Sequence, residues 1–305
     1  FTRELLFFFF RKKVYKKRID KKIGKLIRGK KKLPTNKIDS LIVSVTSFPE
    51  RIIDIKYTIY SLLTQSVIPE KIVLWLETDR FPLREKSLPA ELLAFSKFNL
   101  QIHWCEEDLR SYTKLIPSLK VFPDYFIVIA DDDIFYKKRW LEKLWNEHLE
   151  YPDDVICHVA NTITFDANHG VLPYKKWIFN IRSPQSSLLH FPLGVGGVLY
   201  HGKFLFNDIA SKKIFMKLAP YADDIWFYFM IILNNTTVRI VKKPYTNMQY
   251  VNPYREYNLQ KGFKLSRINM DNNKNDIQFK AVSEYYKISL FDLKDAAMDL
   301  RRRKV

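Results

Sequence analysis

The chain has 305 residues, of which 47% are hydrophobic, and its formal net charge at pH 7 is +18. A chain of this length and composition buries a large core, which excludes the disordered and fibrous classes of protein. Only Cys105 and Cys157 are present. Two cysteines form no disulfide framework, so we expect a reducing, cytoplasmic compartment and interpret both thiols as core residues.

Most of the positive charge lies in residues 1–33, which carry a local charge of +12 and include the apolar run Leu5–Phe10. Six apolar residues fall far short of the roughly 20 that span a bilayer. Apolar residues beside dense Lys and Arg favour a peripheral element on an anionic membrane surface, which Arg301–Lys304 could join. A solvated basic run and a nucleic-acid-binding tail are the alternatives. We expect residues 1–36 to form a separate membrane-associating extension.

A catalytic domain is expected over residues 37–260, followed by a helical, basic tail over 261–305. Hydrophobic periodicity predicts strands at 41–46, 71–76, 100–105 and 125–130, and helices at 52–62, 112–121 and 140–149. Buried strands joined by amphipathic helices form βαβ units, which predict an α/β fold with a mostly parallel sheet. His148, at helical spacing, is interpreted as a core-edge residue.

Three consecutive carboxylates, Asp131, Asp132 and Asp133, follow the fully apolar strand predicted at 125–130. Ionised carboxylates at the end of a buried strand require solvent, backbone amides or a cation to compensate them. If the strand geometry persists, Asp131 and Asp133 share a face and Asp132 points away, which makes the pair a half-site for Mg²⁺ or Mn²⁺. The alternative is a solvated turn in which one Asp caps the next helix.

Two features mark the second half of the chain: a glycine cluster at Gly194, Gly196 and Gly197, and the pair Asp223–Asp224 before a long apolar stretch. Clustered glycines indicate unusual backbone conformations or the close approach of a ligand. One of the two aspartates could cap a buried helix, or one could act as a general base.

In six segments the chain resembles bacterial glycosyltransferases of the GT-A fold, similar to glycosyltransferase family 2. These segments occur in consistent order over about residues 40–250: Thr46–Arg51, Lys71–Leu76, Ser111–Pro117, Ile129–Asp133, Gly194–Gly197 and Ala222–Trp226. The resemblance implies a mixed, mostly parallel Rossmann-like sheet flanked by helices. It also implies a metal-dependent transfer of a sugar from a nucleotide-diphosphate donor, UDP-sugar favoured, onto a glycan or lipid-linked glycan acceptor of a surface polysaccharide or lipopolysaccharide.

The resemblance also implies roles for single residues. Asp131–Asp133 would be the DxD motif, with Asp133 and Asp131 as ligands of Mn²⁺ or Mg²⁺. Asp131 and Asp132 would also bind the nucleotide-sugar, Asp131 near its ribose, and Asp132 could take either position. Asp224, or else Asp223, would be the base that deprotonates the acceptor, which predicts inversion; a retaining reaction stays open. The remaining nucleotide-sugar contacts would come from Thr46, Ser47, Arg51, Lys114, Gly196 and Gly197. No Q-x-x-R-W element occurs, so we expect the addition of one sugar.

Two other functions remain open at this point. A metal-dependent nucleotidyltransferase or phosphohydrolase could use the same carboxylates on nucleotides. A nucleic-acid-binding protein would explain the basic charge, but that charge is confined to the ends of the sequence and no recognition motif occurs. We therefore expect an enzyme on the inner face of the cytoplasmic membrane that binds no nucleic acid.

Overall fold

The computed structural model describes residues 3–252 and 273–292, with side chains from residue 15 onward within those ranges. The basic run Arg301–Lys304 and the side chains of Leu5–Phe10 lie outside this description. No helix within the described residues combines the length and the apolar character needed to cross a membrane.

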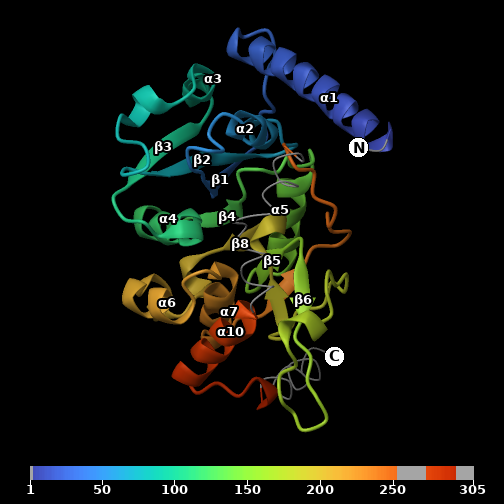
Figure 1. Cartoon of the computed structure of the whole chain (residues 1–305), viewed down its shortest axis with the longest axis vertical. Coiled ribbons are helices and arrows are strands. Elements are labelled where there is room, and N and C mark those ends of the chain that lie inside the picture. Colours follow the sequence, from blue (N-terminus) through green and yellow to red (C-terminus); the bar gives the residue numbers. More distant parts are fainter. Residues whose placement is uncertain (1–2, 253–272, 293–305) are drawn as a thin grey trace.

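A seven-stranded sheet with the order β3-β2-β1-β4-β8-β5-β9 runs through the described part of the molecule (Figure 1). Its strands are β1 (Lys37–Thr46), β2 (Ile68–Glu77), β3 (Leu100–Cys105), β4 (Phe126–Ala130), β5 (Val155–Cys157), β8 (Val198–Tyr200) and β9 (Val238–Ile240). Every strand pair is parallel except those of β8, which is antiparallel to β4 and β5. The mixed, mostly parallel α/β sheet expected from the sequence is confirmed.

Helices flank this sheet and include the three that periodicity predicted in the first half of the chain. They are α1 (Arg3–Ile27), α2 (Ile55–Leu63), α3 (Ala90–Leu93), α4 (Ile116–Val121), α5 (Trp140–Glu150), α6 (Lys212–Leu218), α7 (Asp223–Leu233) and α10 (Lys274–Tyr285). The strands β6 (Ala160–Thr162) and β7 (His190–Pro192) form a separate antiparallel pair. Helix α7 is buried along most of its length, as its apolar sequence predicts, and α10 packs against it through Phe279.

The second half of α1 is part of the domain core, although residues 1–36 were expected to form a separate extension. Ile19, Ile23 and Leu26 are at most 3% exposed and belong to the same apolar cluster as the central strands. Lys16 also forms an ion pair with Asp54, which directly precedes α2. Figure 1 shows α1 lying beside α2 at one end of the molecule. Its i, i+4 and i+7 spacing gives α1 an apolar stripe, and that stripe is buried against the domain.

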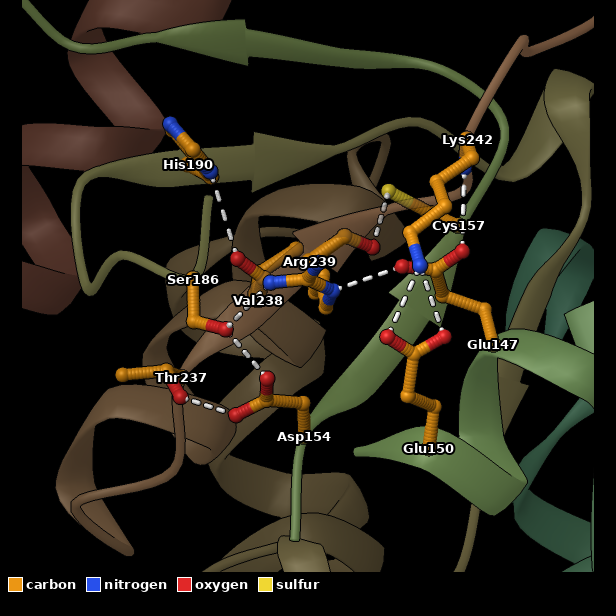
Figure 2. A network of polar contacts seen from close by, with 10 residues as sticks. All are labelled: Glu147, Glu150, Asp154, Cys157, Ser186, His190, Thr237, Val238, Arg239 and Lys242. Atoms are coloured by element: carbon orange, nitrogen blue, oxygen red, sulfur yellow. Dashed lines mark hydrogen bonds and ion pairs between the residues drawn. The ribbon is translucent and has the colours of Figure 1, made fainter. Parts of the chain in front are cut away.

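The outer edge of the sheet is fixed by a buried polar network between α5 and β9 (Figure 2). Arg239 on β9 donates from Nε to Glu147 Oε1 at 2.7 Å, and both side chains are less than 10% exposed. Ser186 and Thr237 donate to the two oxygens of Asp154. Removing one partner of a buried ion pair leaves an uncompensated charge, so this network holds β9 against α5. Its buried carboxylates are satisfied, which indicates a structural role.

Candidate active site

The strand order reverses at the centre of the sheet, because β2 and β3 lie on one side of β1 and β4 lies on the other. Ligands of open α/β sheets bind beyond the carboxyl ends of the strands at such a switch point. Val45 of β1 pairs with Ala130 of β4, so the two strands end at the same edge. Ser47 and Asp131, the first residues of interest beyond these ends, are therefore brought to the same place.

Arg51 connects the turn after β1 to the acidic turn after β4. Its Nη1 atom lies 2.7 Å from Asp132 Oδ1 and 2.8 Å from Asp133 Oδ2. Ser47 donates to the other oxygen of Asp132 at 2.6 Å, and Thr58 of α2 donates to the Asp132 carbonyl at 2.8 Å. Burial nevertheless raises the pKa of Asp132, because desolvation outweighs the Arg51 guanidinium and the Ser47 hydroxyl. Asp132 is thus fully engaged in holding the turn.

The expected alternation of the three aspartates does not occur, because β4 ends at Ala130 and the triplet lies in a turn. Asp132 and Asp133 share Arg51, and Asp131 points instead to Lys114. Side chains alternate only while the backbone stays extended, so the strand argument stops at Ala130. Asp131 has the most accessible carboxylate of the three, with 27% of its side chain exposed against 6% and 7% for the other two.

Lys114 lies between the acidic turn and the start of α7. It ends the 3₁₀ turn η3 (Arg110–Lys114), and its Nζ atom is 2.9 Å from Asp131 Oδ1 and 3.6 Å from Asp223 Oδ2. Burial opposes its charge, but Asp131, Asp223 and Asp224 together raise the pKa of Lys114 well above its ordinary value. The side chain is therefore a fixed cation that links carboxylates far apart in the sequence.

Asp223 and Asp224 are the first two residues of α7, whose N-cap is Ala222. Neither carboxylate caps the helix, so the capping interpretation is wrong. Asp224 accepts a hydrogen bond from the backbone N–H of Gly194 at 3.0 Å. The pKa of Asp224 is raised to about 8, mainly by burial and secondly by the charge of Asp223. Asp223 is a buried residue, whereas Asp224 is only partly buried.

The glycines of the cluster have two different roles. A Cβ atom on Gly196 would lie 2.6 Å from Val159 Cγ2, and one on Gly197, whose φ is +90°, would lie 2.3 Å from Trp140 Cζ2. These two glycines, expected to contact the nucleotide-sugar, are buried in contact with core side chains. Gly194 is the glycine that borders the site, because a Cβ there would lie 3.1 Å from Asp224 Oδ1 and 3.3 Å from Lys114 Nζ.

Other predicted site residues and several unpredicted ones surround this cluster. Thr46 lies at the end of β1, and its hydroxyl donates to the Trp75 carbonyl within the sheet. The Tyr136 hydroxyl oxygen accepts a hydrogen bond from the Asp131 backbone N–H at 2.8 Å. The backbone N–H of Val251 donates to the Asp133 carbonyl at 2.7 Å. No sequence signal identified Tyr136, Val251 or Thr58, because each contact joins residues through tertiary packing. Gly194 was marked by the glycine cluster, but only Gly196 and Gly197 of that cluster were expected to contact the nucleotide-sugar.

The charges of the site fit a divalent cation that also binds phosphate. Five carboxylates, from Asp131–Asp133 and Asp223–Asp224, surround Arg51 and Lys114. Among the described residues, no three His, Cys, Asp or Glu side chains are arranged to hold a metal by themselves. Mg²⁺ is commonly held by one or two carboxylates and takes its other ligands from water and substrate phosphates. The site suits that mode of binding and not a cage made only of protein ligands.

No protein-family model and no curated protein matches the chain. One solved structure with a similar backbone arrangement is 4-diphosphocytidyl-2C-methyl-D-erythritol synthase from Anaerococcus prevotii (14% identity, 72% of this chain and 98% of that chain, TM-score 0.45). A second is CMP:2-keto-3-deoxy-manno-octonic acid synthetase in complex with CTP (11% identity, 72% of this chain and 96% of that chain, TM-score 0.42). A third is residues 1–349 of TarS from S. aureus (16% identity, 82% of this chain and 72% of that chain, TM-score 0.43). At these TM-scores a likeness assigns no function, so function has to be argued from the side chains of the site.

Proposed function

We propose that the protein is a metal-dependent glycosyltransferase that moves a sugar from a nucleotide-diphosphate donor, UDP-sugar favoured, onto a hydroxyl of a glycan acceptor. One observation carries this proposal: Asp224, a carboxyl group with a pKa of about 8, adjoins Lys114 and the acidic turn at the switch point of the sheet. A group that titrates near the working pH is suited to accept a proton in the transition state.

The donor side of the proposed site consists of the acidic turn and the two cations. Asp131 and Asp133 would hold Mn²⁺ or Mg²⁺, which stabilises the negative charge of the departing diphosphate. Arg51 and Ser47 fix Asp132, so the turn is held in place without the metal. Lys114 supplies positive charge beside Asp131, where it would attract a phosphate oxygen as a point charge.

The acceptor side consists of Asp224 and its surroundings. The Gly194 N–H holds one carboxylate oxygen of Asp224, which leaves the other oxygen to take the proton of the acceptor hydroxyl. The accessibility of Asp224 favours it over buried Asp223 as the base. A base on the face of the sugar opposite the diphosphate would produce inversion by direct displacement.

A nucleotidyltransferase is the alternative that uses the same metal chemistry. The attacking group in such a reaction is often an anionic phosphate, and an anionic nucleophile needs no base. Asp224 has no evident role in that reaction. A neutral hydroxyl, in contrast, requires a base to remove its proton. The observed carboxyl group therefore favours transfer to a hydroxyl.

The products of parallel incubations distinguish these reactions. The full chain is mixed with Mn²⁺ and a panel of nucleotide sugars, with and without glycan acceptors, and the released species are identified by ³¹P NMR. Glycosyl transfer predicts nucleoside diphosphate in amounts that equal the glycosylated acceptor. With nucleoside triphosphates and sugar phosphates as substrates, release of pyrophosphate would instead establish the nucleotidyltransferase. Nucleoside diphosphate released equally without acceptor would indicate a hydrolase.

The acceptor is proposed to be a glycan or lipid-linked glycan of a surface polysaccharide or lipopolysaccharide. Residues 1–33, with their charge of +12, would hold the enzyme on the anionic inner face of the cytoplasmic membrane, where such an acceptor is presented. Nucleic acid is not proposed as a partner, because the strongest positive charge lies outside the carboxylate-rich site.

A further inference from the structure

A second concave site lies between α1 and the turn that follows the acidic triplet. It encloses a volume of about 450 Å³ and is lined by residues of α1, the loop after α1, α2 and the segment 135–138. Tyr136 forms part of its wall and also accepts the backbone N–H of Asp131. The cavity is therefore a neighbour of the proposed donor site, separated from it by the Tyr136 side chain.

Four lysines line this cavity: Lys22, Lys31, Lys32 and Lys138. Within the described part of the chain none of them has a carboxylate partner, although most other lysines near the core are paired. Lys31 lies over the Tyr60 ring, with Nζ 4.6 Å from the ring centroid. The pKa of Lys31 is lowered, mainly by burial and secondly by the charge of Lys138. Like charges gathered around a hollow attract an anion of matching size.

The cavity also has apolar and aromatic lining residues. Tyr15 and Ile19 of α1, Leu33 and Phe135 are among them, and the Tyr15 and Phe135 rings meet edge to face at 5.8 Å. A ligand that suits both kinds of lining residue carries a phosphate and an apolar group.

We propose that this cavity binds the phosphate head group of an anionic lipid, with Lys22, Lys31, Lys32 and Lys138 around the phosphate. This site gives a molecular basis to the membrane association included in the proposed function. It rests on that proposed function only for the source of the phosphate. The membrane contact is then a defined site, where the basic N-terminal sequence alone predicts only diffuse attraction. It also places the lipid beside the wall that supports the acidic turn.

Binding of a lipid that stays monomeric in water tests the site without a membrane. The full chain is titrated by calorimetry with dihexanoyl phosphatidate, dihexanoyl phosphatidylcholine and inorganic phosphate at fixed salt. We expect phosphatidate to bind at least about tenfold more tightly than either of the other two, because it alone combines an exposed phosphate charge with an apolar group. Equal binding of inorganic phosphate would overturn the lipid assignment, and no binding of phosphatidate would overturn the site.

Paired substitutions separate the cavity from general surface charge. Lys31→Ala with Lys138→Ala should weaken phosphatidate binding by about tenfold or more, because both ammonium groups face the ligand. Lys21→Ala with Lys25→Ala removes the same charge from exposed positions of α1 outside the cavity, and should change affinity by less than about twofold. Equal losses in the two pairs would refute a defined site. Lys22→Ala with Lys32→Ala provides a second test if the first pair lowers the melting temperature.

Competition distinguishes this site from the donor site. Saturating UDP with Mn²⁺ should leave phosphatidate affinity unchanged, because Tyr136 separates the two sites. Displacement of the lipid by UDP would show that its phosphate occupies the donor site, which would refute the inference. Neither result depends on sugar transfer, so failure here is distinguishable from failure of the proposed reaction.

Discussion

The backbone N–H of Gly194 donates a hydrogen bond to Asp224 Oδ1 at 3.0 Å, and the two residues are thirty positions apart in the sequence. This contact fixes the carboxyl group that we propose as the base. It also favours a residue without a side chain, because a Cβ on Gly194 would crowd both Asp224 and Lys114.

Gly194→Ala should therefore lower turnover by roughly tenfold or more, since small displacements of a catalytic group are costly. The fold should survive, because the crowded atoms are the ends of side chains, those of Asp224, Ile129 and Lys114, and not backbone. The measurement is kcat beside the melting temperature. Gly202→Ala is the control, because a Cβ there meets only the Pro123 carbonyl at 3.7 Å. Full activity of Gly194→Ala would remove this constraint on the base.

Asp224→Asn should reduce turnover by roughly 10² to 10⁴ with little change in donor binding, because the amide keeps the shape but accepts no proton. In the unsubstituted protein kcat should rise with pH up to about 8, the pKa of Asp224. The pH–rate profile and the anomeric configuration of the product check this. A larger loss in Asp223→Asn would reassign the base, and retention of configuration would exclude the inverting mechanism.

The same pKa predicts an opposite effect of Asp224→Asn on stability. The ordinary pKa of 3.8 is raised to about 8 in the folded state, so between these values the folded state binds the proton more tightly than the unfolded chain. This carboxyl group therefore lowers the free energy of unfolding progressively as pH rises from about 4 to 8. Asp224→Asn should raise the melting temperature relative to the unsubstituted protein, and the gain should grow over that pH range. A gain independent of pH would contradict the assignment.

Lys114→Met should move the ascending limb of the pH–rate profile, which the base Asp224 sets, to higher pH. The Lys114 charge lowers the pKa of Asp224, so its removal favours the protonated carboxyl group. Donor affinity should fall as well, since a phosphate partner is lost. Lys114→Arg, which keeps the charge, should retain the position of the profile. An unchanged profile in Lys114→Met would show that the lysine does not act on Asp224.

Asp133→Asn should abolish the effect of Mn²⁺ on donor binding while the protein stays folded. Arg51 retains Asp132 as an ionic partner in this variant, so no buried charge is stranded. Thermal shifts with UDP and Mn²⁺, alone and together, measure the effect because a ligand of the native state raises its stability. Asp39→Asn, at an exposed position with 82% of the side chain accessible, is the control. Normal activity with Asp133→Asn, or in excess chelator, would refute the metal role.

Two N-terminal truncations should behave differently. Removal of residues 1–14 should weaken binding to anionic vesicles and leave transfer to a soluble acceptor nearly intact. Removal of residues 1–33 should also lower the melting temperature, because it takes Ile19, Ile23 and Leu26 out of the core, at about 1.5–3 kcal/mol for each buried aliphatic side chain. Cosedimentation with vesicles at rising salt and thermal unfolding check both statements. Equal stability of the two truncations would show that α1 is not part of the core.

The local sequence determined the architecture of the first half of the chain. Runs such as Leu41–Thr46 and Tyr125–Ala130 are apolar and β-branched because they lie in a buried parallel sheet, and α2 and α5 each follow the helical spacing that packing on a sheet requires. The position of the acidic triplet beyond a strand end follows from the same patterns. Function, in contrast, stays a proposal drawn from residue types and their grouping.

Tertiary structure alone decided which charged groups meet. Asp132 and Asp133 share Arg51, Lys114 turns to Asp131 and Asp223, and Gly194 holds Asp224. These partners come from turns and helix starts, where no periodicity fixes the direction of a side chain. The same reason hides the role of α1: its charge suggests a free surface element, and only packing shows that one stripe is buried. Side-chain pairing across the sheet depends on the complete fold, which brings distant residues within hydrogen-bonding distance.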